Sequence, residues 1–95
     1  MGPTCEVVLE SDDGATLDTI DLLLASIAEQ VTRTRKGRTW DVWVRGRPIH
    51  VHVTGMPPRV ELSAGCNGPE DYTALRELTA AIALTTGGIV SVPEN

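Results

Sequence analysis

Apolar and polar residues alternate along four short segments of the chain, which is the pattern of β-strands that bury one face. These segments are residues 5–11, 40–45, 48–54 and 59–64. Turn-forming residues separate the last three, so we predict that they form two consecutive hairpins. A shorter apolar segment, residues 89–92, is predicted to be a final strand or an extended tail.

Two other segments carry apolar residues at the spacing of an amphipathic helix. Residues 17–32 form the first, with Thr16 as the predicted N-cap. The second is predicted to begin at Pro69, because proline is favoured at the first helical position and two acidic residues follow it. Gly87 and Gly88 are expected to end this helix, since glycine readily adopts the left-handed conformation found there.

The element order is therefore β-α-β-β-β-α, followed by a strand if residues 89–92 join the sheet. Strands in succession, flanked by helices, predict a single α+β domain over residues 1–95, built as a two-layer sandwich. We expect a mainly antiparallel sheet with both helices on one face and the other face open. The layout resembles the ferredoxin-like arrangement with one strand more than the split β-α-β unit, an analogy that implies no function.

The pairing of the three central strands decides which side chains meet on the open face. With residues 46–47 as the first turn, Asp41 lies opposite His52. The second hairpin then places Glu61 on the other side of His52. Both hairpins put their aliphatic residues on the same face, and a slip of one residue would turn that face outward, so the register is strongly specified.

The open face gathers polar residues and one tryptophan, Trp43, which lies opposite His50 in the predicted register. Tryptophan and arginine are enriched among the residues that dominate the binding energy of protein interfaces. The candidate binding residues are Trp43, His50, His52, Asp41 and Glu61, with Arg45 and Arg59 at the rim. A sheet face that simply meets water shows the same alternation, and this interpretation stays open.

A metal site is a further alternative on this face. His50 and His52 project to the same side of one strand, and Asp41 or Glu61 would complete a set of two histidines and one carboxylate. An open sheet face offers no pocket and few supporting groups, so His50, His52 and Glu61 are only the alternative ligand set. No serine or cysteine has a histidine base at a recognisable spacing, so neither an enzyme nor a cofactor is expected.

Composition limits the classes of partner. The chain has 95 residues, 41% of them hydrophobic, and a formal net charge of -5. The negative charge disfavours general binding to nucleic acids or to anionic membranes. No apolar run approaches the ~18 residues of a membrane span, and the N-terminus lacks a signal-peptide pattern. We therefore expect a cytoplasmic protein in which Cys5 and Cys66 stay reduced.

Basic residues concentrate in one part of the chain, with six of the eight between Arg33 and Arg47. Complementarity with the helix dipole and solubility account for such a cluster. The alternative is a docking patch for an acidic partner.

These patterns predict a small acidic protein-binding domain without enzymatic activity, of the inhibitor, immunity-type or adaptor kind. Its partner is expected to be another protein, or a second copy of the chain. One alternative is a metal-binding sensor or small metal-dependent enzyme centred on His50 and His52. Another is a homodimerising structural domain.

Overall fold

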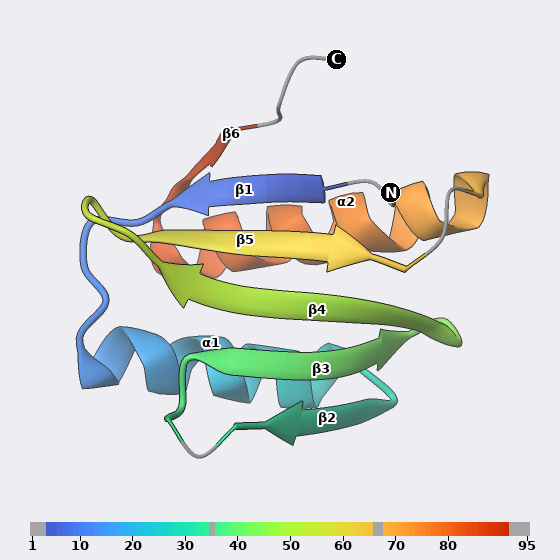
Figure 1. Cartoon of the computed structure of the whole chain (residues 1–95), viewed down its shortest axis with the longest axis horizontal. Helices are drawn as coiled ribbons and strands as arrows, with labels where there is room; N and C mark the ends of the chain where they lie inside the picture. The colour runs from blue at the N-terminus through green and yellow to red at the C-terminus, as the bar shows by residue number, and fades with distance from the viewer. Residues whose placement is uncertain (1–3, 35, 66–67, 92–95) are drawn as a thin grey trace.

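A six-stranded antiparallel sheet carries two helices on one of its faces (Figure 1). The structure is a computed structural model, and it describes residues 4–34, 36–65 and 68–91. The strands of this part of the chain are β1 (Thr4–Val8), β2 (Gln30–Arg33), β3 (Thr39–Val44), β4 (Arg47–Thr54), β5 (Arg59–Ala64) and β6 (Ile89–Ser91), and its helices are α1 (Gly14–Ile27) and α2 (Pro69–Thr86).

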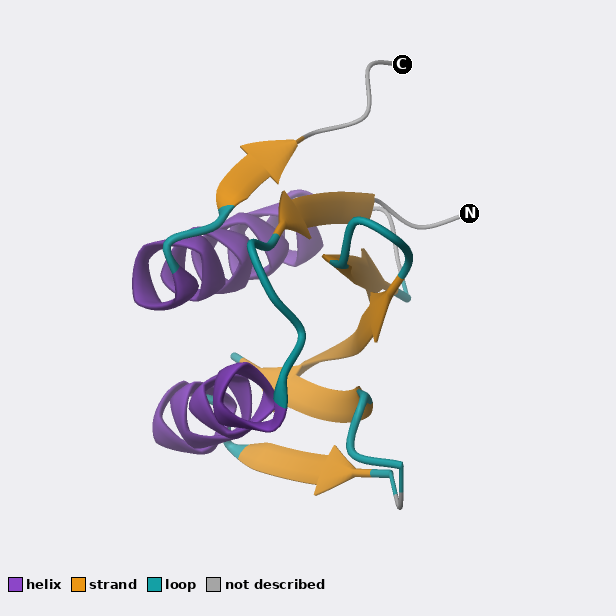
Figure 2. Ribbon diagram, turned by 90° about the vertical axis from the view of Figure 1, so that its left-hand side faces the viewer, coloured by secondary structure: helices purple, strands orange, loops and turns teal. Residues whose placement is uncertain are grey.

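The strand order across the sheet is β2-β3-β4-β5-β1-β6, and every neighbouring pair is antiparallel. Because directions alternate, β1 and β2 run the same way, and so do β5 and β6. Helix α1 connects the first of these parallel pairs and α2 connects the second, and both helices lie on the same side of the sheet (Figure 2). The predicted α+β sandwich and its ferredoxin-like layout are confirmed, with one strand more than predicted.

The additional strand lies where the first helix was predicted to continue to residue 32. Helix α1 instead ends at Ile27, and Gln30–Arg33 forms the edge strand β2. Val31 packs against the core from this strand. Its apolar side chain also fits the stripe of the predicted helix, although Val31 is not helical. Local spacing cannot distinguish the two conformations here, and pairing with β3 decides between them.

Helix α1 also starts earlier than predicted, at Gly14, and Asp13 is its N-cap in place of Thr16. The backbone N–H of Thr16 donates to Asp13 Oδ1 at 2.9 Å. This bond satisfies one of the free amides in the first helical turn. Helix α2 starts at Pro69 as predicted, and Gly87 ends it with a φ of 75°.

The core between the sheet and the helices is aliphatic apart from Trp40, whose side chain is fully buried. The indole Nε1 of Trp40 donates to Asp21 Oδ1 at 2.9 Å, which satisfies its polar atom. The guanidinium carbon of Arg33 lies 5.3 Å from the ring centroid, within cation–π range. Cys5 is a buried free thiol of β1, and Cys66 lies outside the described residues.

The turn between β3 and β4 is formed by Arg45 and Gly46, one residue earlier than predicted. Their φ angles are 55° and 74°, and positive values at both central residues define a type I′ turn. The change moves the β3–β4 register by two residues, so each side chain keeps its face but acquires a different neighbour. The predicted β4–β5 register is confirmed, with His52 opposite Glu61.

The described ranges contain no helix with the length and hydropathy that a bilayer crossing requires.

Candidate functional site

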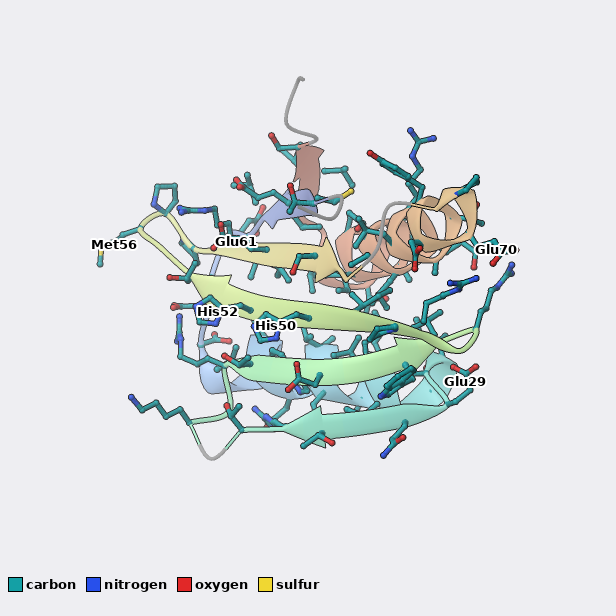
Figure 3. All side chains as sticks on the ribbon, turned by 45° about the vertical axis from the view of Figure 1, so that its right-hand side comes forward. Glu29, His50, His52, Met56, Glu61 and Glu70 are labelled. Atoms are coloured by element: carbon teal, nitrogen blue, oxygen red, sulfur yellow. The ribbon has the colours of Figure 1, made fainter. Side chains whose placement is uncertain are left out.

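The candidate site is the open sheet face, on the side of the sheet away from both helices. Strand β3 illustrates the alternation: Trp40, Val42 and Val44 are buried, whereas Asp41 and Trp43 point outward. Figure 3 shows the outward side chains of β4 and β5. Five of the seven predicted binding residues are exposed: Trp43, Asp41, His50, Glu61 and Arg45. The other two, His52 and Arg59, are half-buried.

Asp41 and His50 form the best-defined pair on this face. They lie directly opposite each other on β3 and β4, and Asp41 Oδ1 is 2.8 Å from His50 Nδ1. The predicted register placed Asp41 opposite His52 and Trp43 opposite His50, and both pairings are wrong. The reason is the position of the turn, because a type I′ turn needs its glycine in second place.

The hydrogen bond to Asp41 also fixes how His50 presents its ring. A carboxylate only accepts, so Nδ1 is the donor, as assigned from the hydrogen-bond partners. In the neutral ring, Nε2 is then an unprotonated acceptor on the far side of the imidazole. Ser63 lies opposite His50 on the other neighbouring strand, β5.

His52 occupies the next row of the face, between Thr39 and Glu61. Its Nδ1 is 2.8 Å from Thr39 Oγ1. The sequence predicted His52 between Glu61 and Asp41. Glu61 is its neighbour as predicted, but Thr39 occupies the position predicted for Asp41. Figure 3 labels His50, His52 and Glu61 on the same face.

The same row contains Glu6, which the sequence analysis did not select. Glu6 of β1 lies directly opposite Glu61 of β5, and like charges in that position destabilise a sheet. Arg59 lies between them: its Nε is 3.6 Å from Glu6 Oε2 and 3.9 Å from Glu61 Oε2. The pairing of β1 with β5 joins distant parts of the chain, so no local pattern could have indicated Glu6.

A shallow hollow of about 360 Å³ lies over this part of the face, between β1, β4 and β5. Its lining residues are Thr4, Cys5, Glu6, His50, His52, Glu61, Leu62 and Ser63. Carboxylates, hydroxyls and imidazoles line it, and the nearby Arg59 is not among the lining residues. Among the lining residues, Glu6, Glu61, Thr4 and Ser63 offer hydrogen-bond acceptors, and Cys5 and Leu62 add apolar surface.

Trp43 marks the other end of the face. Its side chain is 43% exposed, and Pro48 lies opposite it on β4. A second hollow of about 190 Å³ runs beside Trp43, Pro48 and Ser63. The open face thus has an apolar aromatic end and an acidic, histidine-containing end.

Arg45 does not belong to this face, contrary to the prediction. Its Nη2 lies 3.0 Å from Glu77 Oε1 of α2, so the side chain turns toward the helix layer. Two other carboxylates hold the same turn: Glu29 Oε1 accepts from Gly46 N at 2.8 Å, and Glu70 pairs with Arg47.

Within the described residues, four arginines of the basic cluster pair with carboxylates, and Arg45 and Arg47 are two of them. Arg33 lies 3.5 Å from Asp18 and 3.7 Å from Asp21, and Arg38 lies 2.6 Å from Asp12. An acidic partner would have to displace these carboxylates. The alternative of a docking patch for an acidic partner therefore loses support.

The metal alternative lacks a ligand set in the described ranges. No three side chains of histidine, cysteine, aspartate or glutamate in these ranges are arranged to hold a metal ion. His50 directs Nδ1 to Asp41, and His52 directs Nδ1 to Thr39. Glu61 Oε2 lies 3.9 Å from Arg59 Nε.

Neither the sequence nor the fold identifies a family. Comparisons with models of protein families, with curated proteins and with solved structures found no match. Function has to be inferred from the chemistry of the open face itself.

Proposed function

We propose that this chain is a non-enzymatic protein-binding domain whose contact surface is the open sheet face. The observation that carries the proposal is the half-exposed indole of Trp43 on a face that neither helix covers. Tryptophan is among the residues that most often dominate the energy of protein interfaces. Pro48 beside it extends the apolar patch.

The size of the face suits such a role. The molecule measures 34 × 29 × 21 Å, and Figure 1 looks down its shortest axis onto the sheet. The sheet face is thus the broadest side of the molecule. A standard protein interface covers roughly 800 Å² on each partner, which a face of these dimensions can supply.

Hydrogen bonds that hold side chains of the face in place also favour binding. Asp41 holds His50, and Thr39 holds His52, through hydrogen bonds of 2.8 Å each. Side chains already held in one conformation lose less entropy when a partner docks. A small domain with such a face acts by covering part of a partner, as inhibitors, immunity-type proteins and adaptors do.

The test is capture of a partner by the full chain from an extract of the source organism, with Trp43→Ala as the diagnostic variant. Tyr72→Ala is the matched control, because Tyr72 is an aromatic residue of α2 with 42% exposure, against 43% for Trp43. We expect Trp43→Ala to weaken capture at least about tenfold and Tyr72→Ala to leave it unchanged. Circular dichroism checks that both variants fold.

Other outcomes would change the assignment. Equal capture by the wild type and Trp43→Ala would place the contact surface elsewhere. If sedimentation velocity shows a dimer that Trp43→Ala disrupts, the partner is a second copy of the chain and the domain is a homodimerising one.

A further inference from the structure

We infer that the partner inserts a cationic side chain, best an arginine, into the hollow at the acidic end of the open face. The inference rests on the proposed function and specifies the chemistry of the partner. Arginine meets the acceptors of Glu6, Glu61 and His50, while an apolar group of the same partner contacts Trp43.

The first argument is the charge of the hollow. Glu6 and Glu61 face each other across β1 and β5, and one arginine, Arg59, serves both at 3.6 and 3.9 Å. These distances exceed those of a close hydrogen-bonded ion pair, so the two carboxylates retain free lone pairs. With Asp41 nearby, the described ionic groups around the hollow leave it negative. A cation from a partner would relieve the repulsion between Glu6 and Glu61.

The second argument is the direction of the hydrogen-bonding groups. His50 Nδ1–H donates to Asp41, so Nε2 of the neutral ring offers a lone pair. The hydroxyls of Thr4 and Ser63 line the same hollow and can accept as well. A guanidinium carries five N–H donors and no acceptor, which complements this arrangement better than a carboxylate or phosphate would.

The third argument is the distance between the two ends of the face. Pro48, beside Trp43, and His52, beside Glu61, are four positions apart on β4 and point to the same side. At about 3.3 Å per residue they are separated by roughly 13 Å. An extended segment with an aromatic residue at position i and an arginine at i+4 has the same spacing.

These arguments disfavour an acidic occupant. It would place negative charge beside Glu6 and Glu61. The four arginines of the basic cluster that the structure describes are already engaged by Asp12, Asp18, Asp21, Glu70 and Glu77.

The experiment is an NMR titration of the ¹⁵N-labelled full chain with two acetylated, amidated pentapeptides. Both have tryptophan first and threonines in the middle; one ends in arginine and the other in citrulline, its uncharged analogue. We expect the arginine peptide to shift amides of β1, β4 and β5 near Glu6 and His50, and to bind about tenfold more tightly than the citrulline peptide.

Two single-charge variants and a matched control locate the effect. Glu6→Gln and Glu61→Gln should each reduce the preference for arginine several-fold. Glu10→Gln removes one exposed carboxylate outside the hollow and should leave the preference intact. A preference that survives both Glu6→Gln and Glu61→Gln would show that the arginine binds elsewhere.

Equal affinity of the two peptides, shifts confined to another surface, or no shift with either peptide would each overturn the inference. These failures remain separate from failure of the proposed function. If capture of a partner depends on Trp43 but not on Glu6 or Glu61, the open face remains the binding surface. The inferred arginine contact is then wrong.

Discussion

Asp41 and His50 lie directly across from each other on β3 and β4, and their side chains meet at 2.8 Å between Oδ1 and Nδ1. The pair is 67% and 51% exposed, respectively, so it adds little to stability. Its consequence is orientation, because it determines which imidazole nitrogen faces outward. The contact exists only because the hairpin turns at Arg45 and Gly46.

Replacing Asp41 should change the tautomer of His50. In the neutral ring of the wild type, Nδ1 should carry the proton. Asp41→Ala should shift the population toward the Nε2-protonated form, which usually dominates in free imidazole side chains. Long-range ¹H–¹⁵N correlation spectra of the ring report this directly. Thr39→Ala, which removes the partner of His52, should not alter His50, and a change of His50 there would contradict the assigned contacts.

Two glycine substitutions should have opposite effects on stability. An added Cβ at Gly46 or at Gly14 would meet nothing within 4 Å, so space does not distinguish them. Gly46 has a φ of 74°, whereas Gly14 begins α1 with no positive φ. Gly46→Ala should therefore lower the free energy of unfolding by about 1 kcal/mol, and Gly14→Ala should raise it by about 0.5 kcal/mol. Urea denaturation measures both, and equal effects would argue against the type I′ turn.

Asp21→Ala should destabilise the fold much more than Asp18→Ala. Asp21 accepts from the fully buried Trp40 indole at 2.9 Å, and its loss leaves that N–H without a partner. The expected loss in the free energy of unfolding is about 1–3 kcal/mol. Asp18 makes only an exposed pair with Arg33 at 3.5 Å, so its removal should cost less than about 1 kcal/mol.

Asp21→Asn keeps an acceptor for the indole and should recover most of the loss caused by Asp21→Ala. If Asp21→Asn and Asp21→Ala were equally unstable in urea denaturation, the charge of Asp21 rather than the hydrogen bond to Trp40 would be responsible.

Asp13 should make the stability of α1 depend on acidic pH. The backbone N–H of Thr16 donates to its carboxylate, and this hydrogen bond is the main cause that lowers the pKa of Asp13 from 3.8. Because the pKa of Asp13 is lowered in the folded state, its contribution to stability is fully present above pH 3.8. That contribution is lost as the pH falls through the lower pKa of the folded state. Asp13→Ala should thus lower the Tm at pH 7, and the difference from wild type should shrink in that acid range.

Asp13→Asn separates the cap from its charge. Asparagine also caps helices well, so this variant should keep most of the Tm at pH 7. Because asparagine does not titrate, the Tm of this variant should fall less between pH 7 and acidic pH than the Tm of the wild type. Thermal melts by circular dichroism between pH 7 and pH 2.5 test all three proteins, and a wild-type acid profile identical to that of Asp13→Asn would contradict the prediction.

Local chemistry explains which parts of the fold could be predicted. The bounds of Arg59–Ala64 and the start of α2 at Pro69 follow from alternation and from the preference of proline for the first helical position. The outward positions of Trp43, His50 and His52 follow from the two-residue period of strands, which survives a register change of two residues.

The neighbours within the open face were decided by tertiary structure. Whether the β3–β4 hairpin turns at residues 45–46 or 46–47 depends on one backbone conformation, that of Arg45 at a φ of 55°. This choice joins Asp41 to His50 rather than to His52. The edge strand β2 likewise depends on β3 as its partner, because Val31 is suited to a helix stripe as well as to a strand.

Local sequence patterns were enough to predict the α+β class, the two helices and the face of the sheet on which the side chains within the central strands lie. Those properties depend on residues close together in the chain, where spacing and turn preferences act. Long-range packing, by contrast, places Glu6 opposite Glu61 and turns Arg45 toward Glu77. These contacts join segments far apart in sequence, and they form only when the packing of β1 and α2 onto the central strands brings the side chains together.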